Sequence, residues 1–256
     1  MQKPIFSPTS WRIYPLSIAD QQLHIDMSEM LLASTASGDP ATLYWSQAER
    51  PGLVLGFSQK HSVLNAQALE AYRLPIYHRK AGGTAVLVGS HLLSLDVILP
   101  AGHPLILPDI VESYRWFGEA WAAALRELGI ETRSVPVAEA HEQRALLKRP
   151  ETAQREAILR RACYGSLSPY EVVAGQGQRK VVGLDMVRRR TGSLLQAGVL
   201  LQWETGTLSQ LLGHTPEEQA ILREGLRERA VGLDSLAGRA VPAHEVITAL
   251  ERVLHT

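Results

Sequence analysis

The sequence has very little cysteine, no excess of either charge and no long apolar run. One cysteine, Cys163, occurs among 256 residues, so an internal disulfide and a multi-cysteine metal site are both excluded. The 26 basic and 26 acidic residues balance, which removes the overall positive field that recruits nucleic acid or an anionic membrane surface. No window approaches the roughly 18 apolar residues of a transmembrane helix. We therefore expect a soluble, cytoplasmic protein of a reducing compartment.

Several familiar motifs are also missing. The nine histidines include no H-E-x-x-H pattern and no pair four residues apart beside a carboxylate, so no metal site is predicted. Residues 1–11 lack the basic and then apolar order of a secretory signal peptide. The pair Gly82-Gly83 does not have the spacing of a dinucleotide-binding or Walker phosphate loop. Function must therefore be sought in residues that are scattered along the chain.

Helix-like and strand-like patterns follow one another irregularly. Helical spacing of apolar residues predicts helices over residues 18–34, 65–72, 110–128, 208–212, 216–229 and 242–254. Strand patterns occupy residues 41–45, 53–56, 75–78, 84–87, 91–99, 170–173, 180–182 and 193–202, with a hairpin turn at 175–178. The polar stretch 139–162 is predicted to be a surface excursion with helical pieces. The irregular order predicts an α+β fold with a central mixed or antiparallel sheet flanked by helices.

Two features of the sequence could carry chemistry, a single thiol near cations and a glycine-containing loop. Cys163 precedes a basic cluster (Arg179, Lys180 and 188–190), and nearby cations can lower the pKa of a free cysteine from about 8.5 toward neutrality. The alternative is that Cys163 is a small buried apolar residue. The stretch Arg79-Lys80-Ala81-Gly82-Gly83-Thr84 can bring backbone N–H groups close to an anion or carbonyl, or can simply be a sharp turn.

A group of short motifs, taken together, resembles the biotin/lipoate A/B protein ligase family, which includes lipoate–protein ligases and cysteine-dependent octanoyltransferases. The resemblance covers about residues 11–205. These motifs are Gly56-Phe57-Ser58-Gln59, Arg79 to Val86, Cys163 ahead of Pro169-Tyr170-Glu171-Val172, Lys180-Val181-Val182-Gly183 and Leu195-Gln196-Ala197-Gly198.

The resemblance implies a catalytic domain over residues 1–206, with residues 207–256 as a small helical extension of the same domain. It implies that Cys163 takes an octanoyl or lipoyl group from acyl carrier protein, or from a lipoyl-domain protein, as a thioester. A lysine of a lipoyl-domain protein, such as the glycine cleavage H protein, would then accept the acyl group. Lys180 would orient the acyl carbonyl, no metal or organic cofactor would be needed, and neither nucleic acid nor membrane would be a partner. Substrate-binding positions would be Arg79, Gly82, Gly83, Thr84, Gly183, Gln196 and Gly198.

The sequence also departs from the family pattern. Val88 and Ala197 stand where relatives usually carry histidine, Gly183-Leu184-Asp185-Met186 replaces a usual G-S-A-Q, and position 84 is Thr rather than Gly or Arg. Two alternatives therefore stay open. One is a lipoate–protein ligase that uses ATP and magnesium and does not need Cys163. The other is a catalytically silent relative that binds an acyl chain or a lipoyl domain.

Overall fold

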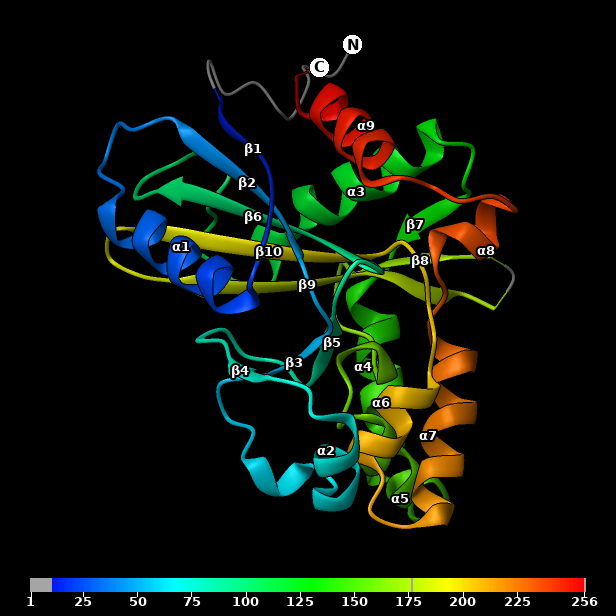
Figure 1. The fold of residues 1–256 in the computed structure, drawn as a ribbon. Helices are drawn as coiled ribbons and strands as arrows, with labels where there is room; N and C mark the ends of the chain where they lie inside the picture. Colours follow the sequence, from blue (N-terminus) through cyan, green and yellow to red (C-terminus); the bar gives the residue numbers. More distant parts are fainter. Residues whose placement is uncertain (1–10, 176, 256) are drawn as a thin grey trace.

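A seven-stranded sheet runs through the upper half of the molecule and a three-stranded sheet lies below it (Figure 1). The computed structural model describes residues 11–175 and 177–255. The large sheet has the order β1-β2-β6-β10-β9-β8-β7 and the small sheet the order β4-β3-β5. The strands are β1 Trp11–Ala19, β2 Ala41–Ala48, β3 Gly52–Leu55, β4 Ile76–His78, β5 Val86–Val88, β6 Leu92–Pro100, β7 Thr132–Ser134, β8 Val172–Ala174, β9 Arg179–Arg188 and β10 Gly192–Leu200.

Helices cover both faces of the large sheet and also pack against the small one. The helices are α1 Gln21–Ser34, α2 Ala66–Tyr72, α3 Arg115–Glu127, α4 Val137–Ala145, α5 Pro150–Leu159, α6 Gly206–Leu212, α7 Pro216–Arg229, α8 Leu233–Ala237 and α9 Ala243–His255. Short 3-10 turns occur at His61–Val63, Glu112–Tyr114, Leu146–Lys148 and Cys163–Gly165. Both parallel and antiparallel pairs occur, since β1 pairs with β2 in parallel while β6 pairs with β2 and β10 in the antiparallel sense. The predicted α+β class with a central mixed sheet is confirmed.

The two faces of the large sheet are covered by different helices. Alternating side chains of β2, β6 and β10, such as Trp45, Leu95 and Leu195, join α3 and α9 in the main core. The intervening side chains face α1, where Tyr44 and Ile98 pack with Leu31 and Leu32 of the helix. Residues of α9, including Leu250 and Val253, belong to the main core. The C-terminal helix α9 therefore contributes to the main core.

The structure differs from the sequence-based predictions at several boundaries. Residues 11–19 form the edge strand β1, which was not predicted because Pro15 interrupts the strand pattern. The pairing of β1 with β2 is irregular between Tyr14 and Ser17. Proline is tolerated at such an edge or bulge because no ladder hydrogen bond is lost. The predicted helix over 18–34 therefore begins only at Gln21, where Asp20 accepts a hydrogen bond from the Gln22 N–H as the N-cap.

Three further regions refine the predictions. The helix predicted over 110–128 starts as a 3-10 turn and becomes α3 at Arg115. The excursion 139–162 contains helices, as predicted, and the short strand β7 before it was not predicted. Strands β8 and β9 pair as an antiparallel hairpin, but Gln176 of the predicted turn lies outside the described residues. No helix in the described part of the chain is long and apolar enough to cross a membrane.

Candidate active site

A cavity of about 620 Å³ lies between the α1 face of the large sheet, the small sheet and the turn at Cys163. This volume is within the usual range for a small-molecule site. Most of the residues that the sequence singled out border it. They are Cys163, Lys180, Arg79, Gly83, Thr84, Gly183, Gln196 and Gly198. Gly82 is not among the lining residues, although its carbonyl oxygen accepts a hydrogen bond of 2.9 Å from Arg79 Nε.

The Cys163 turn is attached directly to the glycine-containing loop. The Cys163 N–H donates to the carbonyl oxygen of Ala85 at 2.9 Å, and the Ala85 N–H donates to Arg161 at 3.1 Å. Residue 85 therefore forms a two-sided backbone link between residues 79–84 and the cysteine turn. Cys163 itself is partly buried and packs beside an apolar cluster that includes Val54, Val88 and Leu92. Cys163, Lys180 and Gly83 thus border one cavity, whereas Gly82 does not line it.

The glycine-containing loop packs against the end of β3. A Cβ atom added to Gly56 would lie 2.0 Å from the Gly83 carbonyl oxygen, a distance that no side chain can occupy. Gly83 has φ +79°, a left-handed conformation that glycine adopts without strain. Arg79 fastens the same loop, because its Nη2 donates to the Thr84 carbonyl at 3.1 Å. Its Nε also lies 3.5 Å from Asp185 on β9.

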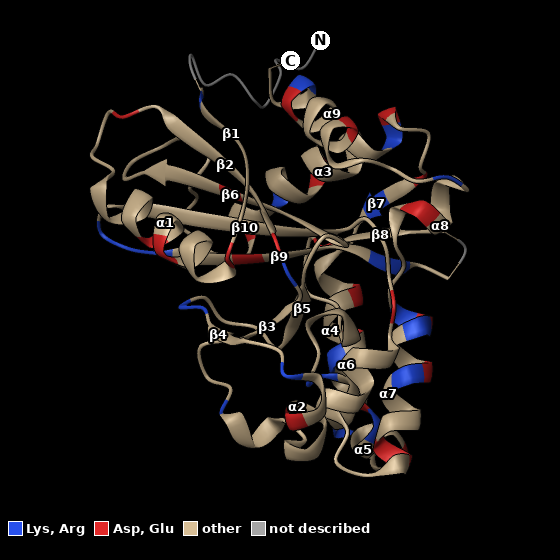
Figure 2. Cartoon of the chain, in the orientation of Figure 1, with Lys and Arg blue, Asp and Glu red and all other residues tan. Residues whose placement is uncertain are grey.

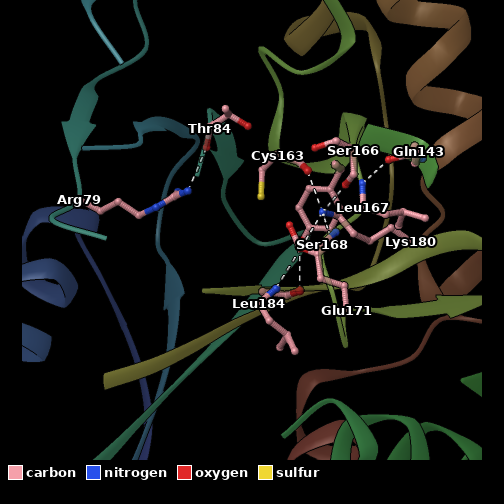
Figure 3. A network of polar contacts seen from close by, with 12 residues as sticks. Arg79, Thr84, Gln143, Cys163, Ser166, Leu167, Ser168, Glu171, Lys180 and Leu184 are labelled. Carbon is pink, nitrogen blue, oxygen red and sulfur yellow. Dashed lines mark hydrogen bonds and ion pairs between the residues drawn. The ribbon is translucent and has the colours of Figure 1, made fainter. Parts of the chain in front are cut away.

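Lys180 is almost completely buried, with 1% of its surface exposed, and it holds the cysteine turn from the other side. Its Nζ donates to the carbonyl oxygens of Cys163 and Ser166 at 2.7 and 2.9 Å. It also contacts both carboxylate oxygens of Glu171, at 2.8 and 2.9 Å. An ammonium has three N–H donors, so these oxygens use them all. Figure 3 shows the Cys163 sulfur pointing away from this network, toward the side where Arg79 and Thr84 lie.

Glu171 completes this buried network. Its carboxylate also accepts from the backbone N–H groups of Ser168 at 2.7 Å and Leu184 at 3.3 Å. Burial raises the pKa of Glu171, and the adjacent Lys180 ammonium opposes that rise. The Tyr164 ring lies 5.1 Å from Lys180 Nζ, and its hydroxyl donates to the Gly198 carbonyl at 2.7 Å. The network therefore fixes the Cys163–Gly165 turn on β9 and β10.

The two positions where relatives usually carry histidine, 88 and 197, lie in different surroundings. Val88 borders the cavity and packs in the apolar cluster beside Cys163. Ala197 borders the cavity too, but it belongs to the core cluster on the α3 face together with Leu195 and Val199. At position 88 the cavity wall beside Cys163 therefore carries an apolar valine and no imidazole. Ala197 is part of the packed core on the opposite face.

Sequence reasoning missed Ser28 and Asp96, which meet the predicted Gln196 at the α1 end of the cavity. Ser28 donates to Asp96, and Gln196 Nε2 donates to the other Asp96 oxygen at 2.9 Å. Burial raises the pKa of Asp96 from 3.8 to about 6. The available signal was a single acidic residue within the apolar run of 91–99. Glu171 was visible next to Tyr170, but nothing in the sequence paired it with Lys180.

Among the described residues, no group of three or more His, Cys, Asp or Glu side chains is arranged to hold a metal ion. Lys180 and Arg79 hydrogen-bond to backbone carbonyls at the cavity, and Gln196 donates to Asp96. The arrangement is that of a thiol beside an apolar wall, with its backbone turn held on both sides. Such a site can form a covalent acyl intermediate without a metal.

Comparison with known proteins agrees with this geometry. The family model of the lipoyl protein ligase A/B catalytic domain matches residues 20–255, and the chain belongs to this family. A relative from Exiguobacterium sibiricum, named octanoyltransferase LipM, is 30% identical over 243 residues, covering 92% of this chain and 82% of its own. The octanoyltransferase LipM of Staphylococcus aureus is 24% identical over 250 residues, covering 95% and 85%.

Solved structures show the same fold. A bipartite lipoate protein ligase from Thermoplasma acidophilum, described with its E2 lipoyl domain, has a TM-score of 0.73 at 18% identity, covering 94% of this chain and 80% of its own. A lipoate-protein ligase A bound with ATP has a TM-score of 0.67 at 19% identity, covering 94% and 83%. These likenesses establish the lipoate ligase-like fold. The predicted family is therefore confirmed.

Proposed function

We propose that the protein transfers an octanoyl group from a carrier-bound thioester to a lysine of a lipoyl-domain protein. The observation that carries this proposal is the position of Cys163, at the wall of a large cavity and beside an apolar cluster. The relatives named octanoyltransferase support the same acyl group. The donor would be acyl carrier protein, and the acceptor would be a lipoyl-domain protein such as the glycine cleavage H protein. We place this reaction in the cytoplasm.

The reaction would proceed in two balanced steps. The Cys163 thiolate attacks the donor thioester carbonyl, a new carbon–sulfur bond forms, and the carrier leaves as a thiol after taking up a proton. The neutral amine of the acceptor lysine then attacks the Cys163 thioester. An amide forms, the carbon–sulfur bond to Cys163 breaks, and the amine proton passes to the released thiolate. Neither step consumes ATP, so no cofactor is part of the proposal.

Lys180 would contribute mainly by holding the turn that carries the thiol. Its contacts with the Cys163 and Ser166 carbonyls fix the backbone from which the sulfur projects. The predicted direct contact with the acyl carbonyl stays a prediction, because it requires Lys180 to exchange one of its present acceptors. Arg79, Gly82, Gly83 and Thr84 would shape the wall opposite the sulfur. Substrate contacts at Gly183, Gln196 and Gly198 would form along the floor.

An ATP-dependent lipoate–protein ligase is the alternative that shares this fold, since one solved neighbour is bound with ATP. ATP and magnesium would be required only in that case. A silent binding relative would show neither activity. Intact-mass spectrometry separates these outcomes. After mixing with octanoyl-acyl carrier protein, we expect a mass gain of one octanoyl group, which is lost again when a lipoyl-domain acceptor is added.

The matched control is Cys163→Ser, which keeps nearly the same volume and should show no stable thioester. Pyrophosphate release with free lipoate and ATP, undiminished in Cys163→Ser, would instead select the ligase. No acyl-enzyme and no pyrophosphate would overturn both enzymatic proposals.

A further inference from the structure

The end of the cavity beneath α1 is polar, which a purely hydrocarbon acyl chain does not explain. Asp96 is the only charged residue in β2, β6 and β10, and it is 5% exposed. Figure 2 shows that charge otherwise lies mainly on helices and connections, while these strands are largely uncharged. A buried charge is costly unless it has a partner, and no cation pairs with Asp96 in the described part of the chain.

The hydrogen bonds around Asp96 leave acceptor positions unused. One carboxyl oxygen accepts from Gln196 Nε2 at 2.9 Å, and the other is bonded to the Ser28 hydroxyl. A carboxylate has about four lone-pair positions, so about two are left. Both Asp96 and Ser28 border the cavity. The unused positions are therefore within reach of a bound molecule.

We call the part of the cavity between Cys163 and Asp96 the arm, and strand β6 gives its length. Leu92 packs in the apolar cluster with Cys163, while Ser94 and Asp96 follow on the same face of the strand. Four residues of strand span about 13 Å. This is comparable to an extended eight-carbon chain with its thioester. A chain attached at Cys163 and lying along β6 would thus have its far end near Asp96.

The row across the sheet supports the same placement. Tyr44, Asp96 and Gln196 are register neighbours on β2, β6 and β10 and so point to the same face. The next row toward Cys163 consists of Ser46, Ser94 and Gly198. These small residues leave room for a chain on the floor, whereas the Asp96 row closes it with hydrogen-bonding groups. A terminal methyl group there would desolvate the carboxyl without replacing its lost hydrogen bonds.

We propose that this arm binds a hydroxyl group at the far end of a medium-length acyl chain, with Asp96 as its acceptor. The inference rests on the proposed acyl transfer and extends its substrate class to ω-hydroxyacyl thioesters. The hydroxyl would donate to a free Asp96 lone pair. Gln196 and Ser28 position the carboxyl through their own hydrogen bonds to it. The same polar groups would disfavour longer, purely apolar chains.

Competition between two thioesters tests the proposal. Octanoyl- and 8-hydroxyoctanoyl-acyl carrier protein are mixed with the full chain, and the initial rates of mass gain on Cys163 give the ratio of kcat/KM. We expect the hydroxylated donor to be used at least as well as octanoyl. Asp96→Leu should shift the ratio toward octanoyl by about tenfold or more, since the hydroxyl then loses its buried partner. Asp96→Asn keeps an acceptor oxygen and should retain most of the preference.

The matched control is Asp39→Asn, at an exposed turn outside the cavity. It should leave the ratio unchanged. A tenfold preference of the natural chain for octanoyl would refute the inference, as would an unchanged ratio in a folded Asp96→Leu protein. If Asp96→Leu does not fold, the comparison of donors in the natural chain decides alone. Acylation by octanoyl only would contradict this inference and leave the proposed function standing. Acylation by neither donor would contradict both.

Discussion

Asparagine at position 96 would reproduce the hydrogen bonds that a protonated Asp96 makes. Ser28 Oγ contacts both the His24 carbonyl oxygen, at 2.7 Å, and Asp96. One hydroxyl proton cannot serve two acceptors. Ser28 donates to Asp96 while the carboxyl is ionised, whereas a protonated Asp96 donates to Ser28 and leaves the hydroxyl proton to the His24 carbonyl. An asparagine Nδ2 can donate in the same way while its Oδ1 accepts from Gln196. We therefore expect Asp96→Asn to fold and to remove a pH dependence.

The sign follows from the raised pKa. The folded carboxyl keeps its proton to about pH 6, whereas the reference value is 3.8. Its contribution to stability is therefore full below pH 3.8 and is lost as the pH rises through about 6. The whole change corresponds to about 3 kcal/mol. Between pH 8 and pH 5 the natural chain should gain about 1.4 kcal/mol relative to Asp96→Asn.

Urea unfolding of both proteins at pH 5 and pH 8 measures this difference. The titratable side chains that face Asp96 are His24 of α1 and Tyr44 of β2, while Gln196 of β10 carries no charge. Because His24 and Tyr44 are present in both proteins, their own titration largely cancels. At pH 8 we expect Asp96→Asn to be the more stable protein. A stability difference that does not change with pH, or a less stable Asp96→Asn at pH 8, would refute the reasoning.

Three further predictions concern the cysteine turn. Cys163→Ala should abolish the acyl-enzyme in intact-mass spectra. The thermal midpoint should change little, because only a partly buried sulfur is removed. Retained acyl transfer would show that another residue is the nucleophile. Lys180→Met should lower the free energy of unfolding in urea by about 3–5 kcal/mol, because Glu171 would stay buried without its cation. Adding Glu171→Gln should recover much of this loss. Losses that simply add would contradict the coupling of the two residues. Gly56→Ala should displace the Gly83 carbonyl and slow acylation at unchanged cysteine content, and a fully active variant would show that this contact is not needed.

The fold could be predicted where the local pattern and the tertiary environment agree. Strand β6 has apolar residues at alternate positions, and the strand pattern predicted it to within one or two residues. The pattern failed at β1, where Pro15 interrupts an edge strand, and at β7, which has only three residues. A short strand has too few residues for alternation to be recognised, and its position depends on the partner strand β8.

The site could be predicted only in part, for a physical reason. Cys163, Lys180 and Gly83 were singled out through the resemblance of the short motifs around them to a known family. Asp96 and Glu171 were not, because their roles depend on burial and on partners that only the folded chain brings near. Ser28 is 68 residues from Asp96, and Gln196 is 100 residues away. An acidic residue in a strand pattern does not reveal whether it faces solvent or a cavity.

The Lys180–Glu171 pair shows why such residues are placed at a site despite their cost. Replacing a buried ion pair by apolar groups often preserves or increases stability, so stability alone does not account for it. An apolar pair could fill the space, but it could not bond the carbonyl oxygens of Cys163 and Ser166. Those two carbonyls would then be left without their buried donor, and the turn would lose its attachment to β9. The ion pair therefore supplies a fixed direction for the thiol, which a packed apolar core would not specify.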